Sequence, residues 1–169
     1  MPHSKQYDMM LAMTESPANT LCKACGLCCT GHIFAWTKLR SPELDSIQAL
    51  GVPVFREPER RGFNQPCPLW QGVCTVYDTP NYPRFCHTYK CKLLKELLAE
   101  TISLDNALPV IEQTHNLIQE VTALLPPSAN PNFSERVLDQ LEHPNTPTEL
   151  HSAIENLLVV YKSRFGVTA

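Results

Sequence analysis

The sequence has no run of apolar residues long enough to cross a bilayer as a helix, which takes about 20 of them. The best apolar run near the N-terminus, Met9 to Met13, is also too short for the core of a signal peptide. We therefore expect a cytoplasmic protein with no membrane partner, in a compartment where glutathione and thioredoxin keep thiols reduced.

Several motifs that would indicate other functions are also missing. The formal net charge is -3, so the chain lacks the excess of positive charge that nucleic-acid binding needs, and nucleic acid is not an expected partner. The sequence has no G-x-G-x-x-G loop for a nucleotide-type cofactor and no paired acidic residues near its cysteines, so no catalytic constellation is identifiable. The paired C-x2-C motifs of a zinc ribbon and the second half of a C2H2 finger are absent as well.

Cysteine, in contrast, is abundant and clustered. The eight cysteines form two groups: Cys22, Cys25, Cys28 and Cys29, then Cys67, Cys74, Cys86 and Cys91. In a reducing compartment such clusters are more often metal ligands or redox groups than disulfides. We therefore predict that all eight are metal ligands.

The first group contains the spacing Cys22-x2-Cys25-x2-Cys28, which ferredoxins use to hold iron–sulfur clusters. We expect a short loop that turns these three sulfurs inward, with Gly26 in an unusual backbone conformation. The spacing favours an iron–sulfur cluster slightly over zinc, although soft thiolate sites accept both. Cys29 directly follows Cys28, and consecutive side chains of an extended segment point apart, which suggests a second site. Eight cysteines complete two four-thiolate sites, or one such site with four thiols left for packing or redox roles.

The distribution of cysteines divides the chain into a flexible leader (1–20), a cysteine-cluster region (21–92) and a helical region packed on it (93–169). Together they predict one α+β domain that is mainly α, with a small irregular metal-binding region and a set of amphipathic helices.

Four elements are expected in the cysteine region. The composition of 32–39 favours a strand, and Ser41, Pro42 and Gly51 delimit a helix over about 42–50. Residues 52–66 suggest a loop, and 66–77 a hairpin. A turn between Trp70 and Gln71 would place Cys67 opposite Cys74, close enough to share a metal. Cys86 and Cys91 are five residues apart, so on one regular helix their side chains would lie on different faces. The chain between them must therefore bend if both bind at one site.

The C-terminal region shows helical spacing of apolar residues. Ser103 is a candidate cap, Pro109 is expected to start or kink the next helix, and a short helix follows at about 134–141. Thr146 and Glu149 predict a capping box for the last helix. Its apolar stripe (Leu150, Ile154, Leu157, Leu158, Tyr161 and Phe165) is expected to face the core, or else to form a partner-binding groove.

Other polar residues receive weaker assignments. His32 and His87 lie near the clusters and are either ligands or, with more support, hydrogen-bonding neighbours. Arg56, Arg60 and Arg61 suggest a solvated loop, or alternatively a basic binding patch. The remaining histidines are expected at the surface: His3, His115, His143 and His151.

The order of motifs resembles a known family. Cys-x2-Cys-Gly-x-Cys-Cys is followed by Cys-Pro-Leu, Gly-x-Cys-x-Val-Tyr, Pro-x-x-Cys and a last Cys. This series is similar to that of the YkgJ-like cysteine-cluster proteins, whose domain is described as zinc- or iron-chelating and has a counterpart in flagellin lysine N-methylases. The resemblance covers roughly residues 22–91, a little under half of the chain, and includes all eight cysteines.

The chain departs from that family between Tyr77 and Cys86. This stretch holds about two extra residues, and Tyr82 stands where the family has an arginine before proline. Arg84 is the candidate substitute for that arginine.

The resemblance implies metal or cluster binding and does not by itself imply a reaction. We therefore expect a small cytosolic protein that coordinates an iron–sulfur cluster or Zn2+ through cysteine thiolates. The alternatives are a cluster-dependent enzyme, such as a protein-lysine methylase-like transferase, and a redox sensor with Cys28 and Cys29 as reactive thiols.

Overall fold

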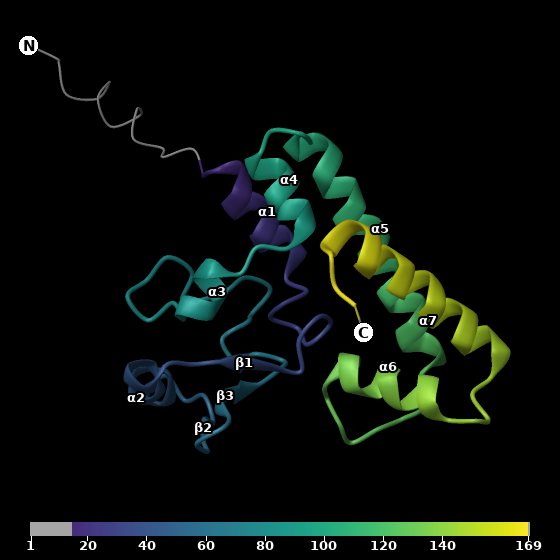
Figure 1. The fold of residues 1–169 in the computed structure, drawn as a ribbon, viewed down its shortest axis with the longest axis horizontal. Helices are drawn as coiled ribbons and strands as arrows, with labels where there is room; N and C mark the ends of the chain where they lie inside the picture. The colour runs from purple at the N-terminus through teal and green to yellow at the C-terminus, as the bar shows by residue number, and fades with distance from the viewer. Residues whose placement is uncertain (1–14, 169) are drawn as a thin grey trace, which may run out of the picture.

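The computed structural model describes residues 15–168. Five helices form the larger part of the molecule: α1 (Pro17–Cys25), α4 (Lys92–Leu98), α5 (Leu104–Leu124), α6 (Phe133–Glu142) and α7 (Thr148–Val160). The smaller part contains β1 (Trp36–Lys38), α2 (Ser41–Ala49), β2 (Phe55–Arg56), β3 (Arg61–Asn64) and α3 (Arg84–Thr88). The two parts lie beside each other in Figure 1. The predicted α+β, mainly α class is confirmed.

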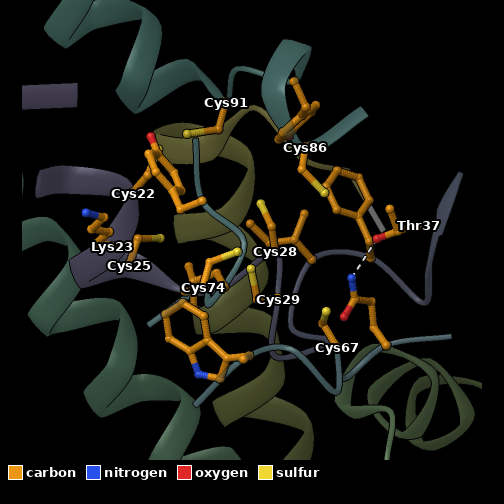
Figure 2. A pocket seen from close by; sticks show the side chains of 18 of the residues that line it. Cys22, Lys23, Cys25, Cys28, Cys29, Thr37, Cys67, Cys74, Cys86 and Cys91 are labelled. Carbon is orange, nitrogen blue, oxygen red and sulfur yellow. Dashed lines mark hydrogen bonds between the residues drawn. The ribbon is translucent and has the colours of Figure 1, made fainter. Parts of the chain in front are cut away.

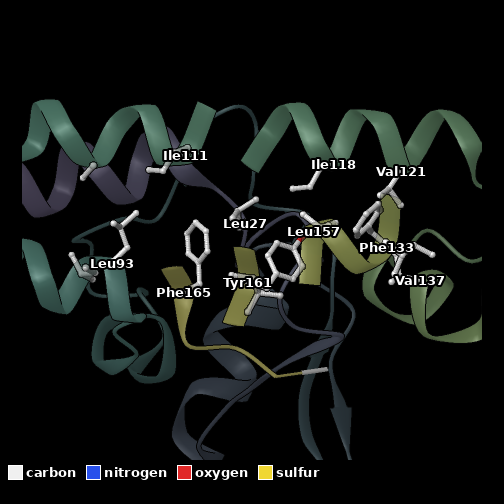
Figure 3. Packing of buried hydrophobic residues seen from close by; sticks show 14 of the residues in the cluster. Leu27, Leu93, Ile111, Ile118, Val121, Phe133, Val137, Leu157, Tyr161 and Phe165 are labelled. Carbon is white, nitrogen blue, oxygen red and sulfur yellow. The ribbon is translucent and has the colours of Figure 1, made fainter. Parts of the chain in front are cut away.

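The helical part packs around a single apolar core. Helix α5 lies against α1 and α7, and its Ile111, Ile118 and Val121 are buried (Figure 3). The stripe predicted for the last helix faces this core, because Ile154 and Leu157 are fully buried. Helix α7 continues into one π-helical turn, η1 (Tyr161–Phe165), whose two aromatic rings are also buried.

The smaller part is a three-stranded antiparallel sheet in the order β1-β3-β2. Thr37 of β1 pairs with Phe63 of β3, and β2 pairs with the other edge of β3. The strand predicted within 32–39 is confirmed, but the loop predicted over 52–66 is wrong because it contains β2 and β3. These strands are two and four residues long, too short to show an alternating apolar pattern in the sequence.

Helix α2 covers the sheet with a second, smaller core. Leu44 and Ile47 of α2 are buried with Leu39, Val52 and Phe63. The predicted helix over 42–50 is confirmed within one residue at each end. Its cap differs from the expected Ser41, because Arg40 precedes the helix and donates its backbone N–H to Glu43 at 2.7 Å.

The predicted ends of the C-terminal helices agree with the structure only in part. Ser103 caps α5, as predicted, by accepting a hydrogen bond from the Asn106 N–H at 3.3 Å. Helix α5 does not start at Pro109, which lies inside it. The capping box predicted at Thr146 is wrong: Pro147 occupies the cap position, and the Thr146 hydroxyl donates to the Gln140 carbonyl at 2.6 Å.

The N-terminal leader is described only from residue 15. Ser16 caps α1 by accepting a hydrogen bond from the Asn19 N–H, so the last residues of the predicted leader are already helical. Within residues 15–168, no helix is both long enough and apolar enough to cross a membrane.

Candidate metal centre

All eight cysteines line one cavity of about 110 Å³, to which both parts of the molecule contribute (Figure 2). A single water molecule needs roughly 10–15 Å³ of such volume, so the cavity has room for more than one small group. Most other lining side chains are apolar or aromatic, and every cysteine is a free thiol. The cavity is thus a sulfur-rich site with mostly apolar walls.

The first two cysteines lie on α1 rather than in a loop. Cys22 and Cys25 are three residues apart and therefore occupy one helix face. The helix ends at Gly26, whose φ of 62° is left-handed, as predicted for this glycine. Cys28 and Cys29 follow in the turn after the helix. The expectation that one short loop holds all three spaced thiols is thus wrong, because α1 extends through Cys25.

The predicted hairpin over 66–77 is also wrong. The pairing found in this segment is an isolated antiparallel bridge between Trp70 and Cys74, so Cys67 does not lie opposite Cys74. The Cys67 N–H donates instead to the Cys29 carbonyl at 2.7 Å. Pro66 and Pro68 flank Cys67 and have no N–H, so the segment cannot build a longer ladder. The hydrogen bond directly joins the second cysteine group to the first.

The last two cysteines lie on different helices. Cys86 is part of α3, and Cys91 is the N-terminal cap of α4, with its Sγ accepting a hydrogen bond from the Leu94 N–H at 3.5 Å. Between them the backbone of Tyr89 is extended. The predicted bend between Cys86 and Cys91 is confirmed.

The sulfurs surround the cavity and do not converge on one point. Among residues 15–168, no three His, Cys, Asp or Glu side chains lie close enough together to hold a single metal ion. One buried polar atom adds to the site: Gln65 lines the cavity and its Oε1 has no hydrogen-bond partner among the described residues. The Gln65 Nε2 donates to the buried Thr37 hydroxyl at 2.6 Å. Cysteine sulfurs are the donor type that iron–sulfur clusters and soft metals take, so the chemistry of the donor set fits such a group.

Burial controls the protonation of the thiols. It raises the pKa of Cys22 to about 11 and the pKa of Cys25 and Cys86 to about 12, and neighbouring thiolates add to each rise. The pKa of Cys28 is raised well above its ordinary value for the same reasons. Reactive thiols have a lowered pKa, so these thiols, with a raised pKa, have the opposite character.

Among the described residues that line the cavity, Lys23 is the one with a charged side chain. Its Nζ forms an ion pair with Glu15 and lies 5.2 Å from the centre of the Tyr77 ring. Arg84, the candidate substitute for the family's arginine, is exposed and does not line the cavity. Tyr82, at the family's arginine position, does line it and donates its hydroxyl to the Cys86 carbonyl at 3.2 Å.

The histidines within residues 15–168 do not line this cavity. His32 hydrogen-bonds Thr30 and packs against Phe133, and burial lowers its pKa to about 4. His87 is exposed. His32 thus has the hydrogen bond predicted for a neighbour of the site, whereas the His87 ring lies 6.1 Å from that of Tyr82, which lines the cavity.

His115 corrects the expectation of a surface residue. It is partly buried on α5, and its Nε2 donates to the Cys25 carbonyl at 2.8 Å, which fixes the end of α1. The two residues are far apart in the sequence, so no local pattern could have indicated the contact. Of the other three, His143 is exposed, His151 lies 3.5 Å from Glu155, and His3 lies outside the described residues.

The three arginines considered as a basic patch are exposed, and each has a partner within the molecule. Arg56 pairs with Asp45 at 2.7 Å, Arg61 donates to Ser41 at 2.7 Å, and Arg60 lies 4.2 Å from the centre of the Phe55 ring. These contacts agree with a solvated surface segment.

Comparison with known proteins finds no matching family model, no matching curated protein and no matching solved structure. The resemblance to the YkgJ-like family therefore stays a prediction from the motifs.

Proposed function

We propose that this protein binds an iron–sulfur cluster, or zinc, through the thiolates of its cysteines. The observation that carries the proposal is the meeting of all eight cysteines at one cavity, although they are spread from Cys22 to Cys91 and lie on two helices, a turn, a loop and a helix cap. Cysteines used only as small apolar residues have no reason to meet in this way.

The arrangement supports a cluster more than a single ion. A structural zinc site places four ligand atoms about 2.0–2.3 Å from one ion. In a [4Fe–4S] cluster each cysteine binds a different iron atom, so the four cysteine sulfurs surround the cluster at a distance from one another. Thiols that line a cavity without converging on a point match the second arrangement.

The protein's own residues would supply charge and exclude water. The thiols must lose their protons to bind metal, so loading releases protons into solution. The apolar walls restrict access of water, and backbone N–H groups, such as that of Leu94 at the Cys91 Sγ, provide partners for the bound sulfur. A reducing compartment such as the cytoplasm belongs to the proposal, since it keeps the thiols available.

The test is anaerobic purification of the full chain followed by analysis of iron, acid-labile sulfide and zinc. A coloured protein with iron and sulfide in equal amounts supports the cluster, and a colourless protein with zinc supports the alternative metal. A folded protein that takes up neither, even after reconstitution, contradicts the proposal. Cys25→Ser and Cys28→Ser should both lower the metal content.

A thiol redox sensor would behave differently in an alkylation experiment. Thiols that are protected in the isolated protein and become reactive after a chelator is added support metal binding. Thiols that react fully in the loaded protein support the sensor. Because Lys23 is the one charged side chain among the described lining residues, we do not extend the proposal to methyl transfer or another reaction.

A further inference from the structure

We infer that the eight cysteines form two separate four-thiolate sites. Site one consists of Cys22, Cys25, Cys28 and Cys91, and site two consists of Cys29, Cys67, Cys74 and Cys86. This inference rests on the proposed function and adds the number of bound groups and the ligands of each.

The members of site one share their structural support. All four are partly buried against the helical core, and they are the only cysteines in contact with it among the described residues. Cys22 and Cys25 come from α1, and Cys91 begins α4, which packs directly on α1. The helical core, with the turn that follows α1, therefore supports all four thiols.

The members of site two are held by the irregular segments around the small sheet. Cys67 packs against the smaller core, and its N–H donates to the Cys29 carbonyl at 2.7 Å. Cys74 lies in the same loop as Cys67, with Trp70 bridging to it. Cys86 sits on α3, where the Tyr82 hydroxyl holds its carbonyl.

The close view of the cavity shows how the thiols are spread. In Figure 2, Cys22, Cys25 and Cys91 lie to the left, Cys67 and Cys86 lie to the right, and Cys28, Cys29 and Cys74 lie between them. The adjacent Cys28 and Cys29 belong to different sites and mark the border.

A buried amide beside site two points to an occupant there. Gln65 is 5% exposed, precedes Pro66 and Cys67 in the chain, and lines the cavity. Its Oε1 has no partner among the described residues, while its Nε2 is bound to Thr37. The amide of Gln65 can be rotated by 180°, which exchanges the positions of its oxygen and nitrogen. The Thr37 hydroxyl can donate as well as accept, so it keeps a hydrogen bond to Gln65, while the Nε2–H takes the position of the unpaired oxygen. A thiolate or cluster sulfur would accept that hydrogen bond.

The experiment compares one cysteine from each site. Cys91→Ser keeps an oxygen that can cap α4, because serine is a favoured N-cap residue. Cys74→Ser changes a loop position. With two sites, each single variant should keep about half of the wild-type metal and the double variant almost none. Circular dichroism of each variant checks that the helices are intact.

A single variant that is folded and either loses all metal or keeps all of it overturns the two-site division. A second measurement on the unmodified protein avoids dependence on variants: two sites protect all eight thiols from alkylation in the loaded state. Four protected thiols and four reactive ones mean one site, so the division fails while the proposed function holds. A protein without metal would instead contradict the proposed function itself.

Discussion

Gly26 shows how one residue can organise the centre. Its left-handed backbone ends α1 directly after Cys25 and turns the chain toward Cys28. The ring of Trp70 lies so close that a Cβ at this position would overlap it. Gly26 is thus both a helix terminator and a point of contact with Trp70, which lies in the segment between Cys67 and Cys74.

Replacing Gly26 tests this double role. An L-residue in the left-handed region costs roughly 1–2 kcal/mol, and overpacking costs about 1–3 kcal/mol more. Gly26→Ala should therefore lower the free energy of unfolding by both amounts and weaken metal retention, as measured by denaturant titration and metal analysis. Gly51→Ala is the matched control, because Gly51 has a φ of 84° and a Cβ at that position would meet nothing within 4 Å among the described residues. Equal losses in the two variants would mean that the Trp70 contact has no energetic role.

Helix α5 is the element that links the helical core to the centre. Its apolar face carries Ile111 and Ile118, and its His115 holds the carbonyl of Cys25. The helix passes through Pro109, although proline usually ends or bends a helix. Pro109 is exposed near the start of α5, where the missing N–H leaves only the Asp105 carbonyl without its helical partner and open to water.

Removing this proline should strengthen α5. Proline is about 3 kcal/mol less favourable than alanine inside a helix, so Pro109→Ala is expected to raise the free energy of unfolding by up to that amount. Pro42→Ala in α2 is the control, since Pro42 lies in the first turn, where the N–H has no helical acceptor. Thermal and denaturant unfolding measure the stability of both variants relative to the unmodified protein. A destabilised Pro109→Ala protein would show that the fold needs a bend at this position.

At the scale of the whole molecule, the buried thiols couple folding, metal and pH. In the metal-free protein, burial raises the pKa of Cys22 and Cys25 from about 9 to about 11 and 12. The folded state therefore holds protons that the unfolded chain releases above pH 9, and this contribution to stability is lost as pH rises. Metal binding has the opposite dependence, because it requires thiolates.

Two opposite pH profiles should follow. The free energy of unfolding of the metal-free chain is expected to fall between about pH 9 and pH 12. The loaded protein should instead lose metal as the pH is lowered. Denaturant titration and metal analysis across pH provide the two measurements, and Cys25→Ala should show a shallower fall at high pH. An unchanged slope in that variant would refute the contribution of Cys25.

The sequence by itself determined the parts of this protein that depend on local pattern. Apolar spacing predicted the α4, α5 and α7 faces, Ser103 and Gly51 indicated helix ends, and the clustered cysteines predicted a sulfur-rich site. Each of these features depends on residues within one or two helical turns of one another, so periodicity and side-chain type are sufficient to identify them.

Tertiary structure decided which distant residues meet. Cys91 lies with the cysteines of α1, Cys67 bonds to Cys29, Trp70 covers Gly26 and His115 reaches Cys25. The short strands β2 and β3 exist because they pair with each other and β3 with β1, and not because of their own composition. Such contacts join segments tens of residues apart and leave no periodic signal along the chain, so only the packing of the helices and the sheet could place eight thiols around one cavity.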